Sequence, residues 1–259
     1  MARNSLKDLM PERMERSYIF IQDKGVARVD ELCELLEVSP ATVRRDLEML
    51  ETKGRIRRVH GGAVRIESRL DEPLFDEKTS IAAQEKIRIA EKAAALIHPG
   101  ETVYLDGGST VLQLARLLVD RSDITVVTNS LRATVELSGR GPDLITIGGT
   151  LRRRSQTTVG ALTRLLIDQL HVDKAFMGTI GLSIEEGLTT TDADEAFTKK
   201  QIMQRADQVI LLVDSGKVGK VSFVHAGDLD DLDTVIVDRK IDEKFVRAIR
   251  KQKGEVNLV

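Results

Sequence analysis

Residues 39–62 read SPATVRRDLEMLETKGRIRRVHGG, and this stretch predicts a helix followed by a basic hairpin. Ser39 supplies a hydroxyl N-cap, and Pro40 stands at the first helical position, where its missing N–H costs nothing. The buried face of the helix is marked by apolar residues at spacings of four and three, which are Val43, Leu47 and Leu50. Gly54 ends the helix, and Gly61–Gly62 is expected to form the tight turn of the hairpin.

Two shorter helical patterns precede this stretch. The sequence ELCELLEV predicts a helix that ends near Leu36, which leaves only Glu37 and Val38 before the Ser39 cap. An earlier helix over residues 12–22 supplies a third packing partner. Together these patterns predict a winged helix-turn-helix, in which the third helix enters the major groove of DNA and the hairpin contacts phosphates.

The residues expected to contact DNA lie near the start of the third helix and on the hairpin: Ser39, Thr42, Arg44, Arg45, Arg57, Arg58 and His60. The alternative interpretation is a surface helix whose arginines are only solvated, as most runs of charge are. The tight helix–turn–helix that precedes Ser39 favours DNA binding over this alternative.

Length and charge indicate a second domain with a different task. The chain has 259 residues and a formal net charge of −2, so it exerts no overall attraction on nucleic acid. Residues 1–69 carry 14 Lys and Arg against 12 Asp and Glu, whereas the remainder carries 25 against 29. The basic groups are therefore local, at Arg44–Arg45 and between Lys53 and Arg58.

Composition argues against a disulfide, a metal site and a membrane segment. Cys33 is the only cysteine, and the four histidines show no paired metal spacing. No apolar run has the length of a signal-peptide core or a membrane span. We therefore expect a cytoplasmic protein with no metal, no cofactor and no membrane partner.

From Ser80 onward, apolar runs of strand length alternate with helical patterns. An alanine-rich helix to Ile97 comes first, with Ile87, Ala90 and Ala94 sharing its apolar face. The predicted strands lie at residues 102–106, 124–129, 144–149, 174–179, 208–214 and 234–238 and in the final EVNLV, with helices at 158–170, 193–205 and 241–252 among those between them. This alternation is typical of an α/β domain with a mostly parallel sheet covered on both faces. The expected domains are 1–65 (winged helix-turn-helix), 66–80 (connector) and 81–259 (α/β).

Residues that can bind an anion follow the first predicted strand of this domain. The loop from Asp106 to Thr110 reads DGGST and opens a helix, so glycines permit close approach and the free N–H groups of the helix start favour a phosphate. It is neither a Walker A loop nor a dinucleotide fingerprint. The alternative is a glycine turn with a hydroxyl cap and no ligand. The loop consists of Asp106, Gly107, Gly108, Ser109 and Thr110.

Other polar residues follow the remaining strands and are expected at the same rim of the sheet, because ligands bind beyond the carboxyl ends of parallel strands. They are Thr128, Asn129, Gly149, Arg152, Asp192, Glu195 and Lys217. Carboxylates suit the hydroxyls of a sugar, and the loop and the lysine suit its phosphate. The rim is therefore expected to bind a phosphorylated polyol.

The chain resembles the DeoR-type family of bacterial transcriptional regulators over about residues 13–238. The resemblance rests on SPATVRRDLEMLETKGRIRRVHGGAV, on EKIRIAEKAAALI, LDGGST, VVTNS, IGGTLR and DKAFMGTIGL, and on GLTTTDADEA and LLVDSGKVGK, in this order and spacing. It implies a sensor domain similar to the sheets of ribose-5-phosphate isomerases and CoA-transferases, a sugar-phosphate effector, and a homo-oligomeric repressor of a carbohydrate operon. It also implies that Thr42, Arg44 and Arg45 contact DNA and that the wing contains Arg57, Arg58 and His60. The residues that it implies for the effector pocket are Asp106 to Thr110, Thr128, Asn129, Asp192, Glu195 and Lys217.

The chain departs from the family's pattern in two loops. Family members often have Asp-Ser-Gly and Asp-Ser-Ser-Lys where this chain has Asp-Gly-Gly and Asp-Ser-Gly-Lys. One hydroxyl fewer in each loop leaves the identity of the effector open. The operator, the choice between dimer and tetramer, and the direction of the effector's influence on DNA binding are open as well.

Two functions follow from these patterns. The first is a repressor of operator DNA whose binding is changed by a sugar phosphate through an allosteric coupling of about 1.4 kcal/mol per tenfold change in affinity. The second is a sugar-phosphate isomerase that uses a carboxylate as base and Lys217 as its electrostatic partner. A DNA-binding module is not needed by an isomerase, so the sequence favours a regulator with no catalytic residue.

Overall fold

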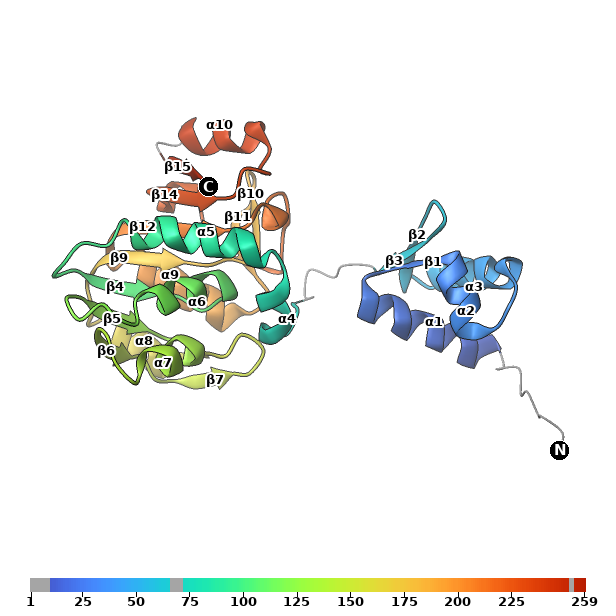
Figure 1. Cartoon of the computed structure of the whole chain (residues 1–259), viewed down its shortest axis with the longest axis horizontal. Helices are drawn as coiled ribbons and strands as arrows, with labels where there is room; N and C mark the ends of the chain where they lie inside the picture. The colour runs from blue at the N-terminus through green and yellow to red at the C-terminus, as the bar shows by residue number, and fades with distance from the viewer. Residues whose placement is uncertain (1–9, 66–71, 252–253) are drawn as a thin grey trace. The chain divides into compact units, whose positions relative to one another are not determined.

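The structure of the protein is a computed structural model that describes residues 10–65, 72–251 and 254–259. The chain divides into two units, Met1–Ser68 and Arg69–Val259 (Figure 1). The first part of the predicted connector, residues 66–71, lies outside the described residues, and its last part belongs to the second unit. That part contains the short helix α4 (Phe75–Ser80), whose Phe75 ring is buried in the core of the second unit.

The first unit is the predicted winged helix-turn-helix. Its helices are α1 (Met10–Lys24), α2 (Val29–Leu36) and α3 (Pro40–Thr52), and its strands β1 (Val26–Arg28), β2 (Ile56–Val59) and β3 (Gly62–Arg65) pair in the order β1-β3-β2. The Ser39 hydroxyl accepts a hydrogen bond from the Thr42 N–H at 3.2 Å, as an N-cap should. The buried face of α3 consists of Val43, Leu47 and Leu50, as its spacing predicts.

The turn of the hairpin differs by one residue from the prediction. His60 and Gly61 form the turn, and Gly61 has a φ of +81°, whereas Gly62 already begins β3. A Cβ atom at Gly62 would lie 2.2 Å from the Ala27 carbonyl oxygen. The second glycine is therefore explained by the close approach of β1 and not by turn geometry.

The second unit is built on a seven-stranded parallel sheet in the order β15-β14-β12-β9-β4-β5-β6. The strands are β4 (Thr102–Leu105), β5 (Thr125–Thr128), β6 (Asp143–Thr146), β9 (Val172–Met177), β12 (Ala206–Val213), β14 (Thr234–Val237) and β15 (Glu255–Leu258). All seven runs that the sequence predicts as strands are strands of this sheet. The α/β class with a mostly parallel sheet is confirmed.

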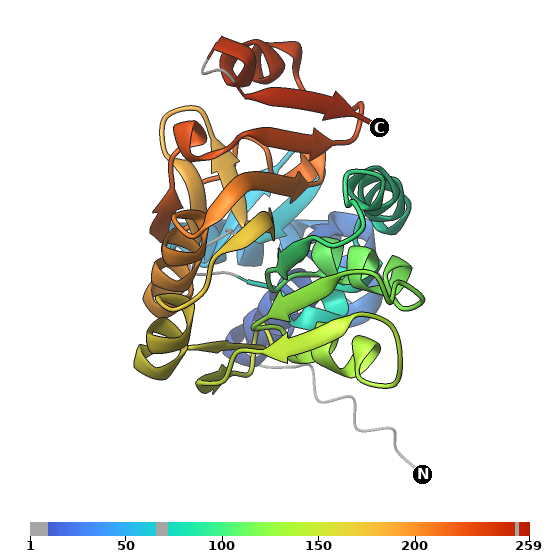
Figure 2. The same ribbon diagram turned by 90° about the vertical axis from the view of Figure 1, so that its left-hand side faces the viewer.

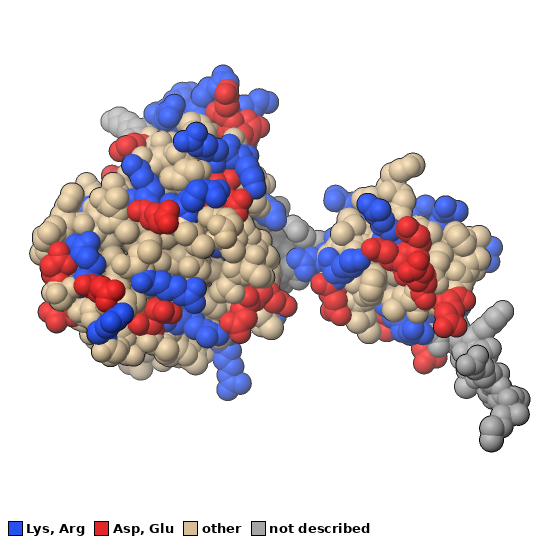
Figure 3. Space-filling model, viewed as in Figure 1, with Lys and Arg blue, Asp and Glu red and all other residues tan. Residues whose placement is uncertain are grey.

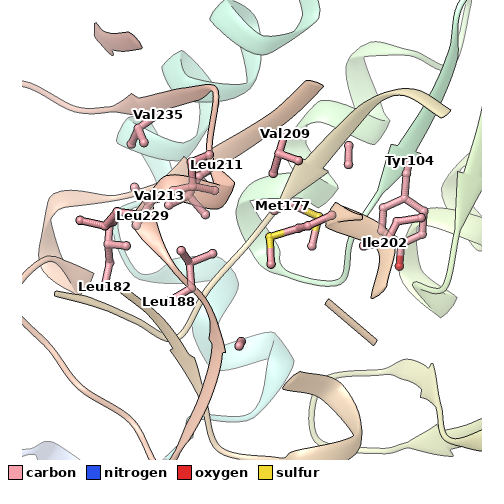
Figure 4. Close-up of a cluster of buried hydrophobic side chains, with 14 of the residues drawn as sticks. Tyr104, Met177, Leu182, Leu188, Ile202, Val209, Leu211, Val213, Leu229 and Val235 are labelled. Carbon is pink, nitrogen blue, oxygen red and sulfur yellow. The ribbon is translucent and has the colours of Figure 1, made fainter. Parts of the chain in front are cut away.

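Helices cover both faces of this sheet, and residues alternate between them along each strand. In Figure 2, α5 (Ala83–Ala94), α6 (Ser109–Leu117) and α7 (Leu131–Leu137) lie on one side, and α8 (Ala161–Ile167) and α9 (Ala193–Met203) lie on the other. Val103 and Leu105 of β4 pack with the first group, whereas Tyr104 between them packs with the second. Figure 4 shows Tyr104, Met177 and Ile202 in this second cluster, to which α10 (Glu243–Lys251) also contributes.

Smaller elements sit beside the main sheet. Strands β10 (Gly181–Ser183), β11 (Gly187–Thr190) and β13 (Val224–Gly227) form an antiparallel sheet, and β7 (Thr150–Arg152) pairs with β8 (Thr157–Val159). Two 3-10 turns, η1 (Ser215–Lys217) and η2 (Leu229–Asp231), complete the unit. The predicted helix over 158–170 was wrong at its start, because β8 occupies the first residues.

The alanine-rich helix is shorter than predicted and turned by about one residue. Its buried residues are Lys86, Ile89, Ala90 and Ala93, and Ile87 is 37% exposed. No helix in the described ranges has the length and apolar character that a membrane crossing needs. Within those ranges, no group of three His, Cys, Asp or Glu side chains is arranged to hold a metal ion.

Candidate functional site

The exposed side of helix α3 carries the predicted DNA-contacting arginines. Arg44 and Arg45 are exposed, whereas the next residue, Asp46, is buried and accepts a hydrogen bond from the Arg13 guanidinium at 2.6 Å. This ion pair fixes the rotation of α3 against α1. Thr42 is half-buried, and its hydroxyl lies 2.9 Å from the Ser39 hydroxyl. The N-terminal turn of α3 therefore has a fixed shape and presents two cations to solvent.

The hairpin of β2 and β3 separates its arginines into two groups. Arg57, Arg58 and His60 are exposed, and the backbone N–H of Arg58 donates to Glu51 Oε1 at 2.7 Å. Arg55 instead turns toward α1, where its guanidinium donates to Glu15 Oε2 at 2.6 Å. The wing thus offers solvent the three residues that the sequence assigns to DNA.

A pocket in the second unit lies at the carboxyl ends of β4 and β9 and at the start of α6. It is lined by Lys78, Gly107, Gly108, Ser109, Thr110, Val111, Ser155, Gly178, Thr179, Ile180, Glu195, Lys199 and Lys217. Six of the predicted rim residues are in this set. The buried hydroxyl of Thr110 has no hydrogen-bond partner among the described residues. The free N–H groups at the start of α6 and three lysines make the pocket suited to an anion.

An ion pair forms the floor of this pocket. Asp106 is buried, and its Oδ2 accepts hydrogen bonds from the Lys199 ammonium and from the Gly178 N–H, the latter at 2.9 Å. The Lys199 ammonium also donates to the Gly178 carbonyl at 3.0 Å. Burial alone would lower the pKa of Lys199, but the carboxylates of Asp106 and Glu195 outweigh it and raise that pKa. Lys199 therefore stays protonated at neutral pH.

Lys217 is the second cation of the pocket, and its pKa is lowered by its surroundings. Its ammonium donates to the Thr179 carbonyl at 2.7 Å. Burial, together with the nearby ammonium groups of Lys86, Lys78 and Lys199, lowers the pKa of Lys217 to about 8, against the opposing pull of the Asp214 carboxylate. Because a bound anion would restore the usual preference for the charged form, this lysine can respond to a ligand.

Arg152 contacts three carboxylates in and beside the pocket. Its guanidinium lies 2.7 Å from Glu72 Oε2, 3.3 Å from Asp192 Oδ2 and 3.1 Å from Glu195 Oε2. Glu195 lines the pocket, and burial is the main reason why its pKa is raised. Burial also acts to raise the pKa of Glu72, but Arg152 and Lys78 outweigh it and lower that pKa to about 2.

The remaining predicted rim residues support the pocket without lining it. The Thr128 hydroxyl donates to the Leu105 carbonyl at 2.6 Å, and the Asn129 amide donates to the Thr158 carbonyl at 3.0 Å. Asp192 caps α9 by accepting the Glu195 N–H at 3.0 Å. Gly149 gives room to a neighbouring threonine hydroxyl, to which a Cβ atom would come within 2.0 Å. These residues fix the loops that carry the pocket's own side chains.

Sequence reasoning missed two of the three lysines, Lys78 and Lys199. Lys78 lies in what the sequence presents as a charged connector, and Lys199 lies in a helix whose polar and apolar residues do not separate onto two faces. One signal was available, because Lys199 follows Glu195 by four positions and therefore shares its helix face.

Comparison with family models covers most of the chain. Residues 18–69 match the DeoR-like helix-turn-helix domain, and residues 81–239 match the DeoR C terminal sensor domain.

Relatives along the whole chain carry related descriptions. The chain is 34% identical over 252 residues to the uncharacterized HTH-type transcriptional regulator YulB of Bacillus subtilis, which covers 97% of each chain. It is 33% identical over 251 residues to a putative aga operon transcriptional repressor of Escherichia coli O157:H7, covering 96% of this chain and 93% of that one. A ribose 5-phosphate isomerase of Methanocaldococcus jannaschii aligns with 53% of this chain and 55% of its own at 20% identity and a TM-score of 0.40.

Proposed function

The chain belongs to the DeoR family and is a DNA-binding transcriptional regulator. We propose that it is a repressor of a carbohydrate operon, and that its DNA affinity changes when a phosphorylated sugar or polyol binds in the pocket. The observation that carries the effector proposal is the pocket itself. It combines the Gly107–Thr110 loop at the start of α6 with Lys78, Lys199 and Lys217. Three ammonium groups beside free backbone N–H groups match a phosphate group.

The proposed DNA contacts divide into two kinds. Arg44 and Arg45, with Thr42, lie at the start of α3, where a recognition helix reads base edges in the major groove. Arg57, Arg58 and His60 on the wing are suited to phosphates, which add affinity without sequence preference. Ser39 acts through its cap, which holds the first turn of α3 in shape.

The proposed ligand has a phosphate at one end and hydroxyls at the other. Glu195 lines the pocket together with the glycine loop and is held by Arg152, so its carboxylate is available to accept hydroxyl hydrogen bonds. Inorganic phosphate would use only the lysines and the glycine loop, whereas a sugar or polyol phosphate also offers hydroxyls to Glu195. This pairing favours a sugar or polyol phosphate over inorganic phosphate.

The regulator is proposed to act as a homo-oligomer, dimer or tetramer, in the cytoplasm with its operator. A dimer would place two copies of α3 on half-sites about one helical turn apart. On the face of the second unit shown in Figure 3, basic and acidic side chains are intermingled, so that face offers DNA no surface of a single sign. DNA binding is assigned to the first unit because that unit carries the helix-turn-helix.

One observation favours a second function, an aldose–ketose isomerase. Glu195 has a raised pKa and lies 3.8 Å from the Lys199 ammonium, and a carboxyl with a raised pKa is suited to act as a general base. We expect no turnover, since a fused DNA-binding unit serves regulation. Incubation with pentose and hexose phosphates, followed by chromatography of the products, tests this expectation, and isomerised product would establish the enzyme.

A thermal-shift screen tests the proposed effector class. The panel contains ribose 5-phosphate, glucose 6-phosphate, fructose 1-phosphate, fructose 1,6-bisphosphate and glycerol 3-phosphate, each with its unphosphorylated parent. A ligand at about one hundred times its dissociation constant adds roughly 2.7 kcal/mol of stability. We expect a shift from phosphorylated compounds only. A shift from the parent sugars alone, or a shift that Lys199→Met leaves unchanged, would contradict the proposed pocket.

A further inference from the structure

Glu72 is the first residue that the structure describes after residues 66–71, which join the two units, and its side chain is completely buried. Its Oε1 accepts a hydrogen bond from the Lys78 ammonium at 2.8 Å, and its Oε2 accepts one from the Arg152 guanidinium at 2.7 Å. The Thr191 hydroxyl donates to the same Oε2 at 2.6 Å. The start of the described second unit is thus held by a buried carboxylate.

The partners of this carboxylate belong to the pocket. Lys78 lines it, and Arg152 contacts Glu195, which lines it as well. The pocket's cations are therefore shared between the protein's own acid and any anion that enters. With a pKa of about 2, Glu72 is ionised at every physiological pH and occupies these cations with a full charge.

Helix α4 connects this ion pair to the pocket wall. Glu72 precedes α4 by three residues and Lys78 lies within it, and Phe75 between them in the sequence is buried in the core of the second unit. The Arg154 guanidinium adds a hydrogen bond to the Glu72 backbone carbonyl. The segment from residue 72 to residue 78 is therefore held by one apolar anchor and by charges that face a ligand site.

We propose that Glu72 is an internal counter-ion of the pocket, which a phosphate-bearing effector displaces from Lys78, so that occupancy of the pocket loosens the residues that lead to the DNA-binding unit. The inference rests on the proposed function, because it takes the pocket as the effector site. A phosphate monoester carries nearly two negative charges at neutral pH and competes well with one carboxylate. The competition is reciprocal, so a docked Glu72 weakens effector binding and a bound effector weakens Glu72 docking.

The first test compares Glu72→Gln with the unchanged full-length protein, using inorganic phosphate in titration calorimetry. Glutamine keeps the shape but removes the competing charge, so phosphate affinity should rise about tenfold while the thermal unfolding midpoint falls. A rise in phosphate affinity together with a fall in the unfolding midpoint is what the loss of a competing counter-ion predicts. A residue with only a structural role would lower both or leave phosphate affinity unchanged, and either result would overturn the inference.

Asp76→Asn is the matched control for this substitution. Asp76 lies four residues after Glu72, on α4, and its carboxylate contacts Arg132 at 2.6 Å, but at an exposed position away from the pocket lining. Like Glu72→Gln, the control removes one negative charge from the segment of residues 72–78. Its phosphate affinity should match that of the unchanged protein, whereas an equal rise in both variants would show a general charge effect and reject the role of Glu72.

Hydrogen exchange of backbone amides separates the inference from the proposed function. Phosphate should slow exchange in the peptide that contains residues 107–111 and speed it in the peptide that contains residues 74–80, and in Glu72→Gln the second peptide should exchange rapidly without phosphate. Slower exchange at 107–111 with no change at 74–80 in either protein would reject the inference and keep the pocket. If neither inorganic phosphate nor any compound of the panel changes 107–111, the proposed pocket and the inference both fail.

Discussion

The Lys199 ammonium contacts the Asp106 carboxylate, and each of the two side chains is only 2% exposed. Asp106 follows strand β4 of the main sheet, and Lys199 belongs to helix α9, which covers one face of that sheet. The ion pair therefore joins the sheet to this helix layer beneath the pocket. Buried charges of this kind are tolerated because each has its partner and further hydrogen bonds. The floor of the pocket therefore depends on both residues together.

Lys199→Met is expected to destabilise the second unit by about 3–5 kcal/mol, because it leaves the Asp106 charge buried without its partner. Chemical denaturation measures this loss. In the double variant Asp106→Asn/Lys199→Met no charge is left unpaired, so part of the stability should return. Losses that simply add in the double variant would show that the two residues do not act as a pair.

Arg45→Ala is expected to lower operator affinity at least tenfold and to leave effector binding unchanged, because Arg45 is exposed on α3 of the first unit. Gel-shift titration with an operator selected from genomic fragments measures the affinity. Glu48→Ala, an exposed change on the same helix, serves as control and should not weaken binding. Unchanged affinity in Arg45→Ala would remove this residue from the DNA surface.

Phosphate affinity is expected to fall as pH rises above about 8, because Lys217 then loses its proton. A phosphate monoester is already a dianion in this range, so its own titration does not interfere. Calorimetry between about pH 7.5 and about pH 9.5, a window that spans this pKa, should also detect proton uptake on binding. Lys217→Arg should remove most of this dependence, since arginine stays charged, and a dependence that persists would have another source.

Lys217 also affects folding stability, and here its effect increases with pH, whereas its effect on phosphate affinity decreases. The pKa of Lys217 is lower in the folded protein than the ordinary value of 10.5, so the unfolded chain binds more protons between about pH 8 and pH 10.5. Its contribution to the free energy of unfolding therefore increases as pH rises through that window. Denaturation of the unchanged protein against Lys217→Met isolates this contribution, and equal pH profiles would show that the lysine is not perturbed.

Phe75→Ala is expected to destabilise the second unit by about 3–5 kcal/mol, because the ring is 2% exposed and anchors α4 in the core. The neighbouring change Leu74→Ala is the control, since Leu74 is 53% exposed and should alter stability by less than about 0.5 kcal/mol. Thermal unfolding of both variants measures the difference. Equal effects would mean that α4 is not anchored through its aromatic ring.

The sequence predicts the sheet of the second unit better than its ion pairs. Continuous apolar runs such as residues 208–214 fit a strand that is buried on both faces. Such a strand can be predicted without an alternation of apolar and polar residues. The glycine loop after β4 was likewise visible, because glycine and hydroxyl residues at a helix start have a known use. The local sequence pattern identifies such features.

The rotation of helix α5 is a feature that residue spacing does not predict. Sequence spacing favours Ile87 for the buried face, yet Lys86 is 1% exposed and Ile87 points outward. The Lys86 ammonium reaches the backbone carbonyls of Lys78 and Ile81, which come from the preceding helix and turn. A lysine can be buried only if such acceptors are present, and their position is a property of the folded chain.

The pocket was predicted in part for the same reason. Gly107, Thr110 and Lys217 follow strands and could be placed at one rim by topology. Lys78 and Glu72 precede the sheet in the sequence and reach the rim only through the docking of α4. Charged residues in a connector usually remain in solvent, so nothing short of the packing of Phe75 indicates their role.

The strand order of the second unit also sets the order in which the chain can mature during synthesis. In the first unit, Val26 pairs with Val64, so its sheet is complete before β4 is made. In the second unit, Val103 of β4 pairs with Lys174 of β9, so a central strand waits for a neighbour translated about seventy residues later, or roughly 4–14 s at ordinary elongation rates. During that interval, a DNA-binding unit that has already folded is tethered to an unfinished sheet with an open edge, which is the period when the nascent chain is most exposed to aggregation and most in need of a chaperone.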